Sequence, residues 1–339
     1  AYAEAIAVLA TRCTAERVRD NPGVSVKLSA LHPRYEFSKR ERVLGELVER
    51  TLALALMARG ANMGFNIDAE EAERLDLSLD VVAAVLADPR LAGWDGFGIV
   101  VQAYGGRAGH VIDWIEELAR ALGRKVMVRL VKGAYWDTEI KRAQERGLDG
   151  YPVFTRKAMT DLNYLACAQQ LLALRPRIFP QFATHSALTV ATILELATDP
   201  GGFEFQRLHG MGEALYAKLG EDRPDITHRT YAPVGSHRDL LAYLVRRLLE
   251  NGANSSFVAL AADEAVPVSQ LLQRPAEIIG RAENACHPNI PLPRDLYGPE
   301  RKNSRGIEFG ERAALKQLVA AVAAAASPAT GSIADATEI

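Results

Sequence analysis

Charged side chains lie in or directly after several short apolar runs of this sequence. Lys27 lies in the run that begins at Val24, Asp68 closes a second run, and Arg129 lies in a third. A buried cation without a partner costs several kcal/mol, roughly, so each of these cations requires an anionic or electron-rich group nearby. Asp68 is the natural partner of Lys27, although a carboxylate at the end of a strand also caps a following helix in many proteins. These residues predict that Lys27 lies beside Asp68 and that Arg129 has an anionic or electron-rich partner of its own.

A second cation and a group of small and aromatic residues follow Arg129. Lys132 supplies the cation. Gly133 and Ala134 allow a ligand to approach the backbone, because they carry little or no side chain. Tyr135 and Trp136 offer flat apolar faces, with packing of the rings under a loop as the alternative. The segment is therefore a candidate binding site for a ligand that is both charged and flat.

Seven short β-rich runs alternate with segments of helical periodicity, which is typical of βα units around a parallel sheet. The expected strands are 24–29, 63–67, 98–102, 126–131, 178–183, 203–208 and 229–232. The expected helices are 1–19, 39–59, 72–86, 108–122, 156–174, 188–197 and 237–249. A closed barrel of this kind needs eight strands, so we predict an α/β fold, a distorted (βα)8 barrel whose first strand is missing from this chain. An upstream segment or another chain would fill the seam, unless a strand is miscounted.

In such a barrel the chemistry lies at the carboxyl ends of the strands. Polar residues at these ends are Lys27, Asp68, Gln102, Arg129, Thr184, His185, His209 and Tyr231. Thr184 and His185 also precede a helix, whose first N–H groups can hold phosphate. Arg246 and Arg247 stand side by side on the last barrel helix, where they are either solvated surface or a clamp for a substrate carboxylate.

Composition excludes several classes of function. The chain is 48% hydrophobic and 24% charged, with a formal net charge of −2, so it offers no large field for nucleic acid. The three cysteines fit neither a disulfide framework nor a zinc site, and the histidines lack a short ligand spacing, so we expect no metal. No P-loop or strand-associated GxGxxG motif is present. Apolar runs are too short for a membrane span and no secretory signal is visible, so we expect a cytoplasmic protein.

Several motifs together resemble the proline dehydrogenase domain of the bifunctional proline utilization A (PutA) family. They are the stretches 25–35, 66–71, 129–137, 181–185, 208–212, 231–235 and 244–254. The resemblance implies a barrel that holds FAD noncovalently at the carboxyl ends of its strands and oxidises L-proline to Δ1-pyrroline-5-carboxylate. It also implies that electrons pass to a quinone, which requires peripheral contact with the inner face of the membrane. Residues 1–260 would form the barrel, and 261–339 a tail or linker toward an absent aldehyde dehydrogenase domain.

Roles for single residues follow from the matched motifs. The resemblance implies that Lys27, Tyr231, Arg246 and Arg247 contact proline, the arginine pair taking its carboxylate. Asp68 would be the active-site carboxylate beside Lys27, and Arg129 would lie near N5 of the flavin. The implied FAD contacts are Ala69, Gln102, Arg129, Val131, Lys132, Gly133, Ala134, Trp136, Thr184, His185 and Glu250.

The chain departs from the family pattern at both ends. Before Ala1 there is no counterpart of the first strand, which in the family carries an acidic partner for the arginine pair, or of the DNA-binding module, so no nucleic-acid partner is expected. Two rival interpretations stay open. One is another flavin-dependent barrel enzyme, such as a relative of methylenetetrahydrofolate reductase, and the other is a non-catalytic fragment whose open seam prevents flavin binding.

Overall fold

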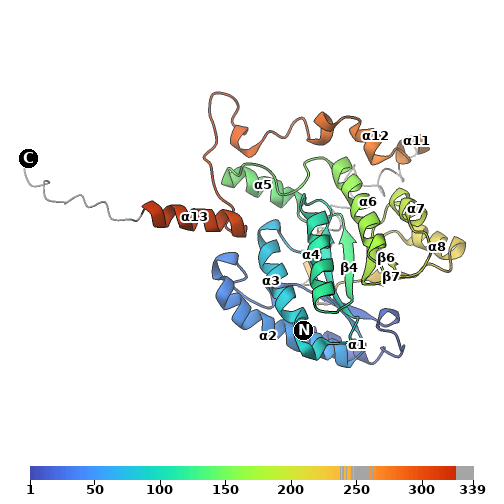
Figure 1. Cartoon of the computed structure of the whole chain (residues 1–339). Helices are drawn as coiled ribbons and strands as arrows, with labels where there is room; N and C mark the ends of the chain where they lie inside the picture. Colours follow the sequence, from blue (N-terminus) through green and yellow to red (C-terminus); the bar gives the residue numbers. More distant parts are fainter. Residues whose placement is uncertain are drawn as a thin grey trace, which may run out of the picture.

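The computed structural model describes residues 1–236, 238, 240, 241, 243–245, 247, 260, 263 and 265–325. Among these, seven parallel strands form one curled sheet in sequence order, from β1 to β7 (Figure 1). The strands are β1 Gly23–Val26, β2 Gly64–Ile67, β3 Phe97–Gln102, β4 Val126–Val131, β5 Ile178–Ala183, β6 Glu204–Leu208 and β7 His228–Tyr231. The predicted fold class and the count of seven strands are thereby confirmed.

The central strands are buried on both faces. All four residues of β2 and the first five residues of both β3 and β4 are buried, as expected for parallel strands covered by helices. The edge strands β1 and β7 are not paired with each other. Arg229 of β7 nevertheless donates hydrogen bonds to the carbonyl groups of Arg19 and Asn21, which precede β1. This side chain links the two edges of the sheet.

Helices cover the outside of the sheet (Figure 1). The α-helices are α1 Tyr2–Ala10, α2 Arg40–Gly60, α3 Leu75–Leu86, α4 Ala108–Ala121, α5 Trp136–Arg146, α6 Lys157–Ala173, α7 Ala187–Leu196, α8 Glu213–Asp222, α11 Val268–Leu271, α12 Pro275–Ile279 and α13 Arg312–Ala325. Short 3-10 helices are η1 Val18–Asp20, η2 Leu28–Ala30, η3 Phe37–Lys39, η4 Ala72–Arg74, η5 Pro89–Leu91, η6 Ala282–Ala285 and η7 Pro293–Asp295. The described residues between 238 and 247 are helical.

The predicted helices differ from the structure at one boundary and at several helices that the sequence did not indicate. The opening helix was expected to reach residue 19, but it ends at Ala10. Asn21 explains the difference, because its side chain accepts from the Ala15 amide and donates to the Ala15 carbonyl, which holds the connection outside a helix. The sequence gave no prediction for α5, α8, α11 or α12. Most residues of α5 are charged or polar, and α8 buries only Tyr216 and Leu219.

The segment from α11 to α13 lies against the barrel for much of its length. Asn303 donates to the carbonyl of Gln144 at 2.8 Å, and the amide of Gly306 donates to the carbonyl of Gly147 at 3.1 Å. Further along, α13 projects away from the barrel (Figure 1). The division into a barrel of residues 1–260 and a tail or linker stays a prediction.

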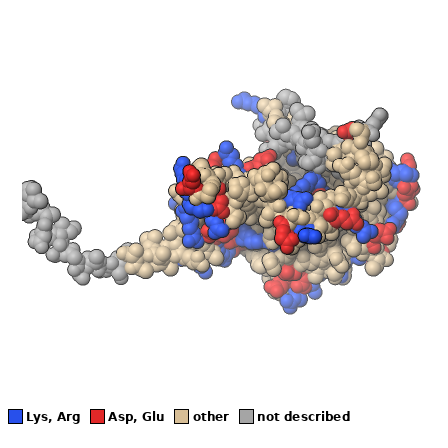
Figure 2. Space-filling view, turned by 90° about the horizontal axis from the view of Figure 1, so that it is seen from above, with Lys and Arg blue, Asp and Glu red and all other residues tan. Residues whose placement is uncertain are grey.

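Acidic and basic side chains are interspersed over the face shown in Figure 2, in agreement with the small net charge. No helix among the described residues is long and apolar enough to cross a membrane. The same part of the chain contains no cluster of His, Cys, Asp and Glu that could hold a metal ion.

Candidate active site

Arg129 is the centre of a polar network inside the barrel. It lies on β4 and is 9% exposed. Its Nε donates to Gln206 Oε1 at 2.7 Å, and its Nη2 donates to Ser25 Oγ at 2.8 Å. Its Nη1 lies 3.2 Å from Asp68 Oδ1. The guanidinium therefore has partners from β6, from β1 and from the residue after β2, which fixes its position.

An aromatic ring completes the surroundings of this guanidinium. Arg129 Cζ lies 5.3 Å from the ring centroid of Tyr231, the last residue of β7. The sequence predicted that Arg129 requires an anionic or electron-rich partner, and the structure supplies both kinds, in Asp68 and Tyr231. Because guanidinium stays charged at any relevant pH, the site holds a fixed cation.

Lys27 shares the same carboxylate. Its Nζ lies 3.5 Å from Asp68 Oδ2 and 3.3 Å from Tyr135 Oη. Burial alone would lower the pKa of Lys27, but the nearby Asp68 carboxylate and the Tyr135 hydroxyl outweigh burial and raise that pKa above its ordinary value. The expected pair of Lys27 and Asp68 is therefore present. Lys27 follows β1, which ends at Val26, instead of lying within the strand as the sequence suggested.

A second layer of polar side chains lies below Arg129 in the barrel. Glu204 is fully buried and accepts from Gln206 Nε2 at 2.7 Å and from Gln181 Nε2 at 3.0 Å. Arg229 Nε lies 3.0 Å from Glu204 Oε1. Sequence reasoning missed this layer. A signal was available, because Glu204 and Gln206 are alternate residues of one strand and so point to the same face.

The side chain of Gln102, the last residue of β3, holds the loop that follows β4 in place. Ala134 donates its amide hydrogen to Gln102 Oε1 at 3.2 Å, while Gln102 Nε2 donates to the Glu70 carbonyl at 2.8 Å. Gly133 has a φ of +145°, and a Cβ at this position would come within 2.3 Å of the Tyr104 ring. Only glycine fits this close approach without a local shift. Gly133 is therefore required here by the close packing of the loop backbone against the Tyr104 ring.

Two further parts of the loop are anchored by side chains. Lys132 Nζ lies 2.5 Å from Asp161 Oδ1, and Trp136 Nε1 donates to the Phe154 carbonyl at 2.8 Å. Trp136 begins α5 and its side chain is partly exposed. The sequence gave no indication of Asp161, which lies on α6.

His185 is held as a neutral acceptor. The amide of Leu208 donates to His185 Nε2 at 3.0 Å. Burial, assisted by the positive charges of Arg247, Arg207 and Lys132, lowers the pKa of His185 to about 4. The neighbouring Thr184 is buried, and Ser186 caps α7 by accepting from the Thr189 amide.

The remaining predicted residues are placed only in part. Arg247 is helical, and its Cζ lies 5.5 Å from the ring centroid of Tyr243. Because Arg247 also lowers the pKa of His185, the described member of the arginine pair faces the same region. Arg246 and Glu250 lie outside the described residues. Ala69 follows β2 and Val131 ends β4, so both are at carboxyl ends of strands, whereas His209, after β6, is exposed.

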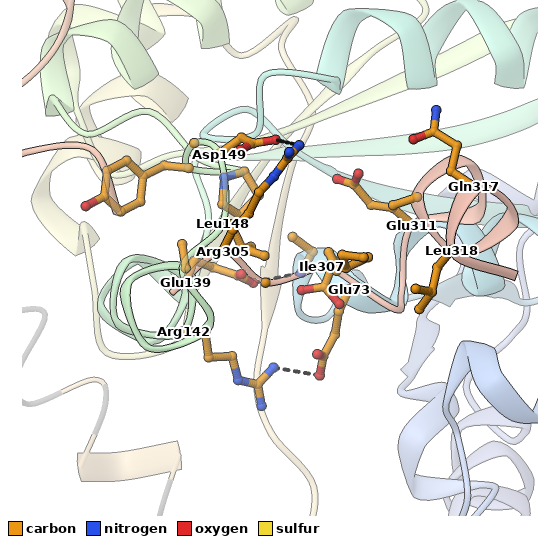
Figure 3. A pocket seen from close by; sticks show the side chains of 18 of the residues that line it. Glu73, Glu139, Arg142, Leu148, Asp149, Arg305, Ile307, Glu311, Gln317 and Leu318 are labelled. Atoms are coloured by element: carbon orange, nitrogen blue, oxygen red, sulfur yellow. Dashed lines mark hydrogen bonds and ion pairs between the residues drawn. The ribbon is translucent and has the colours of Figure 1, made fainter. Parts of the chain in front are cut away.

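A large cavity lies away from these residues. It has a volume of about 610 Å³ and lies between α5, the loop 148–152 and the segment 305–321 (Figure 3). Its charged groups form pairs such as Arg142 with Glu73 and Arg305 with Asp149. A smaller cavity of about 70 Å³ is lined by Asp68, Gln102 and other residues near the strand ends. We place the candidate active site at the strand ends, because the fixed Arg129 and Lys27 cations lie there and not in the larger cavity.

Residues 1–260 match the family described as proline dehydrogenase. The chain belongs to the proline dehydrogenase family. It is 50% identical over 334 residues to the bifunctional protein PutA of Escherichia coli (strain K12), covering 95% of this chain and 25% of the relative. It is 27% identical over 210 residues to proline dehydrogenase 1 of Bacillus subtilis (strain 168), covering 61% of this chain and 60% of that protein.

Solved structures of the family have the same fold. The crystal structure of the Bradyrhizobium japonicum PutA variant D779W matches with a TM-score of 0.94 and 69% identity, covering 95% of this chain and 33% of that one. The chain thus spans about a quarter of the length of the curated PutA relatives and about a third of the solved ones. The predicted family is confirmed.

Proposed function

We propose that this chain is the proline dehydrogenase part of a PutA-type protein, and that it oxidises L-proline to Δ1-pyrroline-5-carboxylate with FAD as its cofactor. The observation that carries the proposal is the cluster of Arg129, Asp68 and Lys27 at the carboxyl ends of the strands of a family member. A folate-dependent flavin barrel is disfavoured by the family match.

The chemistry of the site fits FAD. Lys132 is 29% exposed and can face an anionic group, and neutral His185 together with Gln102 offers polar contacts. The residues that would hold the cofactor are Ala69, Gln102, Arg129, Val131, Lys132, Gly133, Ala134, Trp136, Thr184, His185 and Glu250. When bound, FAD supplies a two-electron acceptor for hydride removed from the substrate.

The chain's own residues bind and prepare proline. Arg246 and Arg247 would bind its carboxylate with paired, charge-assisted hydrogen bonds. Lys27 and Arg129 add two positive charges, which favour the neutral form of the substrate amine by repulsion. Lys27 is not the base in this scheme, because its raised pKa keeps it protonated. Arg129, with three side-chain partners, is a preorganised cation where negative charge develops.

Electrons would then pass to a quinone through peripheral contact with the inner face of the membrane, and the protein would otherwise be cytoplasmic. This part rests on the resemblance to PutA alone. Among the described residues the sheet has seven strands and is open between β1 and β7, which is the basis of a further proposal, that an eighth strand from an upstream segment or another chain completes the barrel.

The visible absorption spectrum of the purified chain tests the proposal. We expect flavin bands, present on purification or after FAD is added, that bleach when L-proline is added without oxygen. A colourless protein that stays colourless with FAD would support a non-catalytic fragment instead. Flavin bands that are insensitive to proline would overturn the substrate assignment while leaving the cofactor.

A further inference from the structure

Asp161 joins two lysines beside the loop that follows β4. It lies on α6, one helical turn after Lys157. One carboxylate oxygen lies 2.5 Å from Lys132 Nζ and the other lies 2.6 Å from Lys157 Nζ. The side chain of Asp161 is 18% exposed and that of Lys132 is 29% exposed, whereas Lys157 is 47% exposed. The pair of Asp161 and Lys132 is thus the more buried half of the cluster.

The positive charges of Lys132 and Lys157 repel each other. Burial lowers the pKa of Lys132, and the charge of Lys157 lowers it further, while Asp161 opposes both effects. The two cations in turn lower the pKa of Asp161, against the effect of its burial, so the carboxylate stays ionised. Without this carboxylate, Lys132 would be a partly buried ammonium next to another cation, which favours loss of its proton.

Among the described residues, the other charged groups near Lys132 offer no substitute for Asp161. His185 faces Lys132, but its pKa of about 4 leaves it neutral. Arg207 and Arg247 face His185 and are cations themselves. One carboxylate between two lysines leaves a net positive charge at this place, so an anionic ligand still finds a favourable field.

We propose that Asp161 is a positioning residue for the cofactor: its carboxylate holds the Lys132 ammonium charged and in place for an anionic group of FAD. This inference rests on the proposed function, in which Lys132 contacts FAD. Asp161 itself does not touch the cofactor in this account. Its charge acts through Lys132, so its effect has to disappear when Lys132 is removed.

The test is the dissociation constant of FAD for the full chain, measured by flavin fluorescence between about pH 6 and about pH 9, a range in which a lysine with a lowered pKa titrates. In Asp161→Asn we expect affinity at the alkaline end to fall by about tenfold or more, equivalent to about 1.4 kcal/mol. Because Lys132 must take up a proton to bind the anion once its pKa is lowered, affinity should also fall more steeply with rising pH than in the parent chain.

Four further variants separate positioning from structural damage. Lys132→Met alone and Lys132→Met with Asp161→Asn should bind FAD equally, with the same pH profile. Lys157→Met leaves the buried pair intact and removes a charge that lowers the pKa of Lys132, so it should bind FAD at least as tightly as the parent at the alkaline end. Asp161→Glu keeps the charge and should recover much of the affinity lost in Asp161→Asn.

The outcomes distinguish the two proposals. A parent chain that does not bind FAD overturns the proposed function and this inference with it. A parent chain that binds FAD, while Asp161→Asn shows parental or tighter affinity and an unchanged pH profile, overturns this inference alone. If Asp161→Asn also weakens FAD binding when Lys132 is already replaced by Met, Asp161 has a structural role that does not act through Lys132. That result would contradict this inference as well.

Discussion

Two charged networks differ in their surroundings, one inside the barrel and one between the tail and α5. Inside, Arg129 is 9% exposed and is held by side chains from different strands. Outside, Glu73 pairs with Arg142 at 2.6 Å and with Arg146 at 2.8 Å, and their side chains are 23 to 38% exposed. Arg305 and Asp149, further along the tail, are 79 and 73% exposed. Similar distances therefore occur in very different dielectric environments.

Burial decides what each network contributes. Charges inside the barrel lose their hydration, so each needs a fixed partner, and removal of that partner strongly destabilises the folded state. Pairs at the surface keep much of their hydration and contribute little each. The tail is attached by backbone contact as well: a Cβ on Gly147 would lie 1.7 Å from the Ser304 carbonyl oxygen. We therefore expect chemistry and stability to depend on the interior network, and tail attachment to depend mainly on backbone fit.

Removing the buried carboxylate of the interior network should have the largest effect on stability. Glu204→Leu leaves the amides of Gln181 and Gln206 without this acceptor. Arg229 loses its carboxylate partner and keeps the two backbone carbonyl groups that it contacts before β1. The expected loss is about 3 to 5 kcal/mol of unfolding free energy, measured by urea denaturation. A loss below about 1 kcal/mol, which is the range for a surface ion pair, would mean that the interior network contributes no more to stability than the outer one.

Replacing the central cation should mainly affect catalysis. Arg129→Met removes the fixed charge, and we expect kcat for proline oxidation to fall by about 100- to 1000-fold, the effect of losing one preorganised donor. Steady-state kinetics with an artificial electron acceptor measure this. Unchanged kcat in a folded, flavin-loaded variant would remove Arg129 from the chemistry.

Gly133→Ala tests the loop above Tyr104. The new methyl group would meet the Tyr104 ring at 2.3 Å in a backbone conformation that alanine rarely adopts, so we expect a loss of about 1 to 3 kcal/mol in stability and weaker FAD binding. Gly106→Ala is the matched control, since a Cβ there meets no atom within 4 Å. Equal thermal midpoints and FAD affinities for the two variants would contradict the close approach.

His185 should make stability depend on pH. Its folded pKa is about 4, below the ordinary value of 6.5, so between these values the unfolded chain binds a proton that the folded chain does not. Stability should therefore fall as pH drops through this window, and His185→Gln should reduce that slope. Urea unfolding at about pH 7 and about pH 5 measures the difference. An identical slope in His185→Gln would assign the effect to other groups.

The smallest effect is expected in the outer network. Glu308→Gln removes the partner of Arg146 that comes from the tail, but Glu73 still pairs with this arginine. The expected change in unfolding free energy is below about 1 kcal/mol, and it should shrink further in high salt. A loss as large as that of Glu204→Leu would show that the tail is held by charge and not by backbone fit.

Sequence reasoning located the strands and the residues at their ends, because apolar runs and breaking residues are local features. It also paired Lys27 with Asp68, since a buried cation needs an anion. It missed Gln206, which contacts Arg129 from 77 positions away, because such pairs depend on how strands curl around the barrel. Asp161 was missed because its contact with Lys132 depends on how α6 packs beside the loop after β4. The length of the opening helix was predicted wrongly, because the side chain of Asn21 hydrogen-bonds to the backbone of Ala15 and apolar periodicity gives no sign of such a contact.

We propose above all that this chain oxidises L-proline at the strand ends. The most direct measurement mixes the FAD-loaded chain with L-proline without oxygen, follows flavin absorbance and identifies the product by mass spectrometry. We predict bleaching with formation of a product two hydrogens lighter than proline, and much slower bleaching in Arg129→Met. Absence of that product, or equal rates in the parent and Arg129→Met chains, would contradict the account.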